Sequence, residues 1–207
     1  MAEPSQIPLP INDTTMAAIL VGGKSSRFGR NKALAKIGDQ SLLECVMTVA
    51  NKVTREVVLV GGRGSDYTWT QLTHVPDLVP GLGPLSGLHA LGQAFPRHSI
   101  LLLACDMPFL DAVILETLLL HSKKPIDCVV PKIAGVVQPL CAVYHQAVQK
   151  HVQTLLHEQG SMQQLLQKCQ TLYLHTQDFL CTPPLEKYFS NVNREEDLHL
   201  RFDRDGS

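Results

Sequence analysis

The sequence predicts an α/β protein with a mostly parallel central sheet and helices on both of its faces. Short continuous apolar runs, the length of buried strands, alternate along the chain with segments of helical pattern. This alternation is typical of a parallel sheet that helices cover on both sides. Several of the runs end in a glycine pair or an aspartate. Because ligands bind beyond the carboxyl ends of the strands in such sheets, these residues mark the edge where we expect a site.

The first half of the chain begins with an expected tail and continues with four expected strands. Residues 1–15 are polar and rich in proline, which predicts a flexible tail. The first strand covers residues 16–21 and stops at a glycine pair. Ser41, with Glu44 three residues later, forms a capping box that predicts a helix to about residue 49. The remaining elements expected here are strands at 56–60, 72–76 and 99–104 and a helix at about 85–95.

The second half of the chain has a more mixed pattern. We expect helices at about 112–121, 146–157 and 161–168 and strands at 128–131, 140–144 and 172–175. The sequence contains no internal repeat, no low-complexity tract and no second domain boundary. Residues 16–207 are therefore expected to form one domain, a length sufficient for a full-sized core.

Composition excludes several classes of partner. The formal net charge is −1 over 207 residues, so the protein has no overall field that would capture nucleic acid. The longest apolar stretch, Ile100–Cys105, is far shorter than the ~20 residues that a membrane span needs. The six cysteines form no C-x-x-C pair, and we expect them to be reduced core residues. The N-terminus does not resemble a signal peptide. We therefore expect a cytoplasmic protein with neither nucleic-acid nor membrane partners.

The glycine-rich segment that follows the first strand is the strongest candidate for phosphate binding. It reads L-V-G-G-K-S-S-R-F-G-R-N-K over residues 20–32. The dinucleotide fingerprint G-x-G-x-x-G does not fit its spacing, and a P-loop would need a glycine at Ala18, inside the strand. A nucleotidyltransferase loop, G-G-x-S-x-R-x-G with a lysine three residues on, does fit. Its glycines let the backbone approach a ligand, Arg27 offers a fork of donors, and Lys32 offers a compact charge.

Several segments of the chain resemble the molybdenum cofactor guanylyltransferases. Residues 20–32 resemble the family pattern L-A-G-G-x-S-x-R-M-G-x-D-K. Three further matches follow in the family's order, at Asp77 with Gly83–Leu88, at Ala104–Phe109 and at Phe189–Leu198, and a weaker one lies at Val137–Tyr144. Together they cover nearly the whole chain from Ile19 to Leu198.

The resemblance implies a Rossmann-like nucleotidyltransferase fold and a defined reaction. The enzyme would transfer GMP from GTP to the terminal phosphate of molybdopterin, or molybdenum cofactor, and release pyrophosphate. GTP would bind mainly to residues 16–110 and the acceptor mainly to residues 111–200. Mg²⁺ is the implied cofactor, and a cofactor insertase or a molybdoenzyme chaperone is the implied protein partner.

The resemblance also assigns candidate site residues. Arg27, Lys32 and Asp106 form the expected catalytic set. Arg27 and Lys32 would hold the triphosphate and stabilise the pyrophosphate as it leaves. Asp106 and Asn193 are the expected metal ligands, since Mg²⁺ takes one or two protein ligands and keeps several waters. The residues expected to bind the nucleotide or its acceptor are Leu20, Val21, Gly22, Gly23, Lys32, Asp77, Ser86, Gly87, Asp106, Asn191 and Asn193.

Within this set we expect different tasks. Asp77 can accept from both N1–H and the 2-amino group of guanine, and is the candidate reader of the base. Ser86 and Gly87, at the start of a helix, are expected to add amide donors to the nucleotide. The acceptor is placed near Leu140 and Asn191.

Two departures from the family pattern stand out. Asn31 stands where the family has an aspartate, and Gly160 is not followed by the usual arginine. If the missing carboxylate orients Lys32 or a metal-bound water, restoring it with Asn31→Asp should raise activity. Alternatively, Asn31 leaves the loop more positive toward the triphosphate, and the substitution would be neutral or harmful.

Two other functions remain open on the sequence. One is a different nucleotidyltransferase of the same fold, acting on CTP or a sugar 1-phosphate. The other is a non-catalytic relative that binds GTP or the cofactor.

Overall fold

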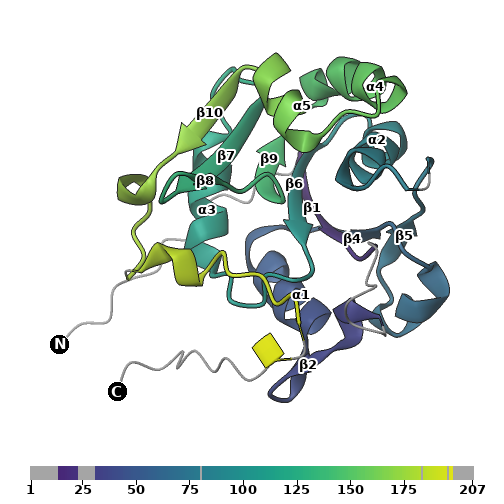
Figure 1. Cartoon of the computed structure of the whole chain (residues 1–207), viewed down its shortest axis with the longest axis vertical. Helices are drawn as coiled ribbons and strands as arrows, with labels where there is room; N and C mark the ends of the chain where they lie inside the picture. Colours follow the sequence, from purple (N-terminus) through teal and green to yellow (C-terminus); the bar gives the residue numbers. More distant parts are fainter. Residues whose placement is uncertain (1–13, 23–30, 80, 183, 195, 198–207) are drawn as a thin grey trace.

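The apolar runs of the sequence form the centre of an eight-stranded sheet. The computed structural model of the chain describes residues 14–22, 31–79, 81–182, 184–194 and 196–197. The strand order is β10-β7-β9-β6-β1-β4-β5, with β8 paired to β7, and helices lie on both faces of the sheet (Figure 1). The predicted fold class is thus confirmed.

The strands nearest the candidate site are parallel to one another. They are β1 (Thr15–Leu20), β4 (Val57–Val60), β5 (Thr73–Val75) and β6 (Ser99–Ala104). β1 lies between β4 and β6 and is parallel to both. Its residues are buried throughout, with Ala17 and Ile19 in the core on one face and Met16 and Ala18 in the core on the other. A strand buried on both faces reads as a continuous apolar run, which is why the sequence reveals it.

The other strands are β7 (Cys128–Ile133), β8 (Val136–Val137), β9 (Cys141–Tyr144) and β10 (Thr171–Leu174). β9 is antiparallel to both of its neighbours, β6 and β7, whereas β10 is parallel to β7. The connection from β7 to β9 is short, and a parallel crossover would need a dozen or more residues. The sheet is therefore mixed at this side.

The helices form two groups that enclose the sheet. They are α1 (Leu42–Val53), α2 (Pro84–Ala94), α3 (Ala112–His121), α4 (Gln149–His157) and α5 (Met162–Lys168). α1 and α3 pack into one core cluster, and α2, α4 and α5 pack into the other. The capping box before α1 is present, with the Glu44 amide donating to Ser41 Oγ at 3.2 Å. None of the helices in the described part of the chain is long and apolar enough to cross a bilayer.

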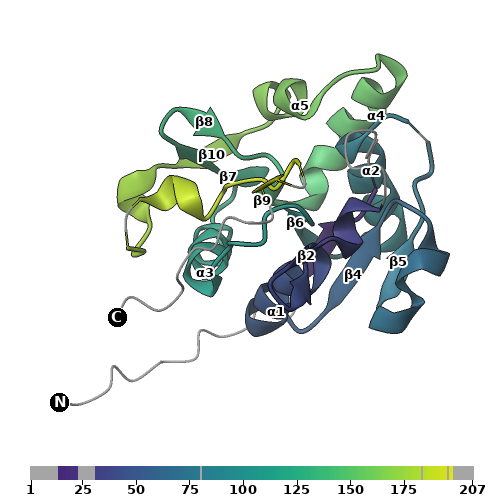
Figure 2. The same cartoon turned by 60° about the horizontal axis from the view of Figure 1, so that its bottom comes forward.

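Several short elements were not predicted from the sequence. They are the 3₁₀ turns η1 (Lys32–Leu34), η2 (Gly64–Thr70), η3 (Gln146–Val148), η4 (Thr176–Asp178) and η5 (Leu185–Lys187), and the hairpin of β2 (Lys36–Ile37) and β3 (Gln40–Ser41). The expected helix at 146–157 is divided into η3 and α4. After η5 the chain runs back toward the end of β6 (Figure 2), where the amide of Val192 donates to the carbonyl of Asp106 at 2.9 Å.

Candidate functional site

A cavity of about 610 Å³ opens at the carboxyl edge of the parallel strands. The ends of β1, β4 and β6 line it, together with the start of η1 and the turn before α2. Its size lies in the range of 300–1,000 Å³ that is usual for small-molecule sites. The expectation that the strand ends meet at one site is confirmed, because Gly22, Gly61, Asp77 and Asp106 all line this cavity.

Two glycines allow the strand ends to approach each other at the floor of the cavity. A Cβ at Gly22 would lie 2.6 Å from the amide nitrogen of Gly62, closer than van der Waals contact permits. Gly61 has φ of +78°, and a Cβ there would lie 3.1 Å from a carboxylate oxygen of Asp77. Both positions therefore require glycine for the ends of β1, β4 and β5 to come this close.

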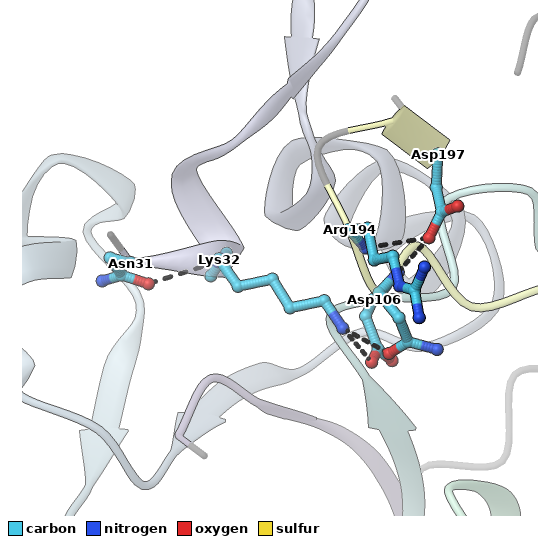
Figure 3. Close-up of polar contacts among 7 residues, drawn as sticks. Asn31, Lys32, Asp106, Arg194 and Asp197 are labelled. Atoms are coloured by element: carbon cyan, nitrogen blue, oxygen red, sulfur yellow. Dashed lines mark hydrogen bonds and ion pairs between the residues drawn. The ribbon is translucent and has the colours of Figure 1, made fainter. Parts of the chain in front are cut away.

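Lys32 and Asp106 line the cavity and meet although they come from distant parts of the chain (Figure 3). Asn193, from a third part of the chain, contacts the same lysine. The ammonium of Lys32 donates to Asp106 Oδ2 at 2.7 Å and to Asn193 Oδ1 at 2.9 Å. The side chains of Lys32 and Asp106 are 17% and 23% exposed, so water screens this ion pair only in part.

The loop that carries Asn193 is fixed by its own hydrogen bonds. Asp197 accepts from the amides of Asn193 and Arg194 at 2.7 and 2.8 Å, and these two bonds hold the pKa of Asp197 below its usual value. Val192 is fully buried in a small cluster with Ala35. These contacts hold the loop so that the side chain of Asn193 lies beside Lys32, near the end of β6.

Asp106 and Asn193 offer a pair of oxygen ligands that fits Mg²⁺. A carboxylate and an amide oxygen contact the same ammonium group, so both point to one place that a cation can occupy. The described part of the chain holds no cluster of three or more histidine, cysteine or acidic residues suited to a metal. A metal here would therefore take its remaining ligands from phosphate and water, as Mg²⁺ does at nucleotide sites.

Asp77 lies on the β5 side of the cavity. Burial raises the pKa of Asp77, and the nearby His74 opposes this rise. His74 is itself held in place, since its Nε2 lies 2.7 Å from the carbonyl oxygen of Gly61 and must donate to it. The carboxylate is thus partly desolvated, which strengthens any hydrogen bond that it accepts from a ligand.

Ser86 and Gly87 pack against neighbouring parts of the protein, and the amide of Ser86, which we expected to face the nucleotide, has a backbone partner. Ser86 is fully buried, its amide donates to the carbonyl of Gly83 at 3.1 Å, and its hydroxyl accepts from the amide of Val79 at 3.1 Å. A Cβ on Gly87 would lie 2.9 Å from the side chain of Leu20. The first turn of α2 therefore packs against β1 and the preceding loop.

The other candidates are placed as follows. Leu20, Val21 and Leu140 line the cavity. Asn191 is exposed, beside the buried Val192. Gly23 and Arg27 lie outside the described residues.

Sequence reasoning missed three polar residues that support the site, namely Asp66, Tyr67 and Asp197. Asp66 and Tyr67, from η2, contact Asn31. The departure of Asn31 from the family pattern was the one feature of the sequence that could have pointed to them. The candidate site residues from the sequence also did not include Cys105, which lines the cavity. Burial raises the pKa of this thiol to about 12, which disfavours its reactive thiolate form.

The chain is similar to known proteins over most of its length. Residues 17–172 match the family described as MobA-like NTP transferase domain. A probable molybdenum cofactor guanylyltransferase of Pelotomaculum thermopropionicum is 32% identical over 191 residues, which cover 87% of this chain and 88% of that protein.

Solved structures agree with this match. The molybdopterin-guanine dinucleotide biosynthesis protein A of Archaeoglobus fulgidus superposes with a TM-score of 0.75 at 25% identity, covering 89% of this chain and 95% of that one. Rv0371C of Mycobacterium tuberculosis, solved in complex with manganese, shares the fold with a TM-score of 0.62 at 18% identity, over 79% of this chain and 88% of that one.

Proposed function

Because the chain belongs to the family of MobA-like NTP transferases, we propose that it transfers GMP from GTP to the terminal phosphate of molybdopterin or molybdenum cofactor in the cytoplasm. The chain is a nucleotidyltransferase, and its relatives are named for the guanylyl reaction. The product would be the guanine dinucleotide form of the cofactor.

The observation that carries this proposal is the contact of Lys32, which lines the cavity, with Asp106 beside it and with Asn193. Nucleotidyl transfer demands little covalent chemistry from the protein. It requires that two anionic groups be held against each other and that negative charge on the leaving group be neutralised. A lysine beside a pair of metal-binding oxygens meets both demands at one place.

The reaction itself can be written through the residues of this chain. An oxygen of the acceptor phosphate attacks the α-phosphorus of GTP, and a new P–O bond forms. The bond from the α-phosphorus to the bridging oxygen breaks, and pyrophosphate leaves with that electron pair. The Lys32 ammonium, exchanged from Asp106 to the outer phosphates, stabilises the charge on the leaving group, and we propose that Arg27 assists it. Mg²⁺, bound through Asp106 and Asn193, would supply the additional charge neutralisation.

The choice of guanine is assigned to Asp77. Its carboxylate lies against Gly61 at the floor of the cavity, and can accept from both N1–H and the 2-amino group of the base. The backbone of residues 20–22 would line the nucleotide, and the acceptor would lie toward Leu140 and Asn191.

The test is a transfer assay with GTP labelled at the α-phosphate, in the presence of Mg²⁺ and molybdopterin. We expect the label in a pterin product and an equal amount of pyrophosphate, and GTP labelled at the γ-phosphate should leave no label on the pterin. Turnover with CTP instead of GTP, or with a sugar 1-phosphate instead of molybdopterin, would assign a different transferase. Tight GTP binding without any transfer would contradict the proposed reaction.

A further inference from the structure

Asn31 lies in a network of hydrogen bonds that explains its departure from the family pattern. Its Nδ2 donates to Asp66 Oδ2 at 3.2 Å and to the hydroxyl of Tyr67 at 3.0 Å. Its Oδ1 accepts from the amide of Ala33 at 3.2 Å. Asp66 and Tyr67 both belong to η2, more than thirty residues away in sequence.

The Tyr67 hydroxyl lies within hydrogen-bonding distance of the Val21 carbonyl and of both polar atoms of the Asn31 side chain. Tyr67 is 3% exposed, and its hydroxyl lies 2.9 Å from the carbonyl oxygen of Val21, which can only accept. The single hydroxyl hydrogen has two acceptors within reach, the Val21 carbonyl at 2.9 Å and Asn31 Oδ1 at 3.2 Å. The shorter contact favours Val21, and the hydroxyl oxygen then accepts from Asn31 Nδ2 at 3.0 Å. Asp66 accepts the second amide hydrogen. Every polar atom of the Asn31 side chain is then matched with a partner of the right kind.

This network connects the two ends of segment 23–30. Val21, near one end, is the first residue after β1 and lines the cavity. Asn31, at the other end, caps η1 through its bond to the Ala33 amide, and Lys32 is the first residue of that turn. Tyr67 contacts both ends, and Asp66 holds the amide of Asn31 from the other side.

We propose that Asp66 and Tyr67 are positioning residues for the transfer reaction, which act through Asn31 to hold Lys32 at the cavity wall. Asp66 supplies from η2 the carboxylate that the family pattern carries at position 31. The proposal rests on the proposed function for its kinetic consequence, but not for its structural one.

The same geometry reverses the expectation that Asn31→Asp raises activity. A carboxylate at position 31 would stand about 3.2 Å from the carboxylate of Asp66, and two carboxylates at that distance repel each other. It would also compete with the Val21 carbonyl for the one hydrogen of Tyr67. We therefore expect Asn31→Asp to displace η1 and Lys32 with it.

A charge-swap series tests the proposal. Its members are Asn31→Asp, Asp66→Asn and the double variant, with two matched controls at exposed sites, Asn51→Asp on α1 and Asp39→Asn before β3. Asn31→Asp should lower kcat with GTP by about tenfold, the size expected when neighbouring residues couple. Asp66→Asn should be mild, because its amide oxygen can still accept from Asn31. The double variant should recover to within about threefold, because the amide introduced at position 66 can donate to the carboxylate introduced at position 31.

The controls define what would overturn the proposal. An Asn31→Asp variant as active as Asn51→Asp, or a double variant no better than Asn31→Asp, would exclude a positioning role for Asp66. If Asn31→Asp fails to fold, Tyr67→Phe and Asp66→Ala decide. Both should fold and lower kcat while the affinity for GDP changes little, and equal losses in kcat and in GDP affinity would contradict the proposal.

A readout that is independent of catalysis separates this proposal from the proposed function. Hydrogen exchange of the Ala33 amide, followed by NMR in the absence of nucleotide, should be faster in Asn31→Asp and Asp66→Ala than in wild type, and should slow again in the double variant. If wild type transfers no GMP but the exchange rates follow this order, the proposed function fails and the network stands. Unchanged exchange at Ala33 in every variant would refute the network itself.

Discussion

The ammonium nitrogen of Lys32 lies 2.7 Å from a carboxylate oxygen of Asp106, the residue that we assign to the metal. The lysine thus neutralises the carboxylate and also donates to Asn193. A divalent cation that binds to the same two oxygens must displace this ammonium group. We therefore expect Lys32 and a metal at the proposed site to compete until a triphosphate offers the lysine another partner.

This competition predicts the effect of Lys32→Met on metal binding. The variant keeps most of the aliphatic side chain and removes the charge, so Mn²⁺ should bind to the nucleotide-free protein about two- to fivefold more tightly, the equivalent of a partly exposed ion pair. Isothermal titration of wild type and variant with Mn²⁺ measures this. Equal or weaker binding by the variant would show that the lysine does not oppose the metal.

The second prediction concerns Lys32 in catalysis. Lys32→Ala should lower kcat/KM for GTP by more than it weakens the binding of GDP, because its assigned task is on the phosphates that leave. Steady-state kinetics and a GDP titration on the same preparation give the two numbers. Comparable losses in both would make Lys32 a general phosphate anchor.

The third prediction concerns Asp106. Asp106→Ala should lower kcat by more than about tenfold, a loss of over ~1.4 kcal/mol of transition-state stabilisation, with little change in the thermal midpoint. The fold should survive because the bond from the Val192 amide reaches the backbone carbonyl of Asp106, which alanine retains. A variant that keeps a larger share of wild-type activity would show that Asp106 is not the principal metal ligand.

The fourth prediction links pH and stability at Asp77. Burial raises the pKa of its carboxyl in the folded protein, so the folded state favours the protonated form, and stability is lost as the pH rises through the folded pKa. Asp77→Asn should therefore raise the thermal midpoint at neutral pH, and this gain should disappear below about pH 4, where the unfolded carboxyl is also protonated. The same variant should discriminate less against other bases, because an amide presents a donor to guanine in place of one acceptor. Thermal midpoints over a pH series measure the effect on stability, and a lower midpoint at neutral pH would contradict it. A panel of nucleotides measures the effect on the choice of base.

The sequence allowed accurate prediction where one element carries a strong local signal. Strand β6 and helix α3 have the bounds expected from their apolar patterns, and the capping box marked the start of α1. The orientation of β9 had no such signal, because an apolar run reads alike in a parallel and an antiparallel strand. The turns η1 and η2 are too short for a helical period to appear.

The site was predictable for a different reason. Gly22, Asp77 and Asp106 follow strands whose carboxyl ends share one edge, so their meeting in the cavity follows from the fold class alone. The bond from the Ser86 amide to the Gly83 carbonyl was not expected, because the sequence does not show which groups the first turn of a helix contacts. The contact of Asn31 with Asp66 joins residues 35 positions apart, and no local pattern announces it.

The return of the C-terminal segment to the end of β6 means that the proposed metal site is completed by a residue that follows the whole sheet in sequence. The last strand of the sheet, β10, ends at Leu174, whereas Asn193 joins Asp106 only after the chain has passed η5. Every strand of the described sheet is therefore encoded before the residue that supplies the second oxygen of the proposed metal site. Translation that stops between these points would yield a chain with every strand but only half of the proposed metal site.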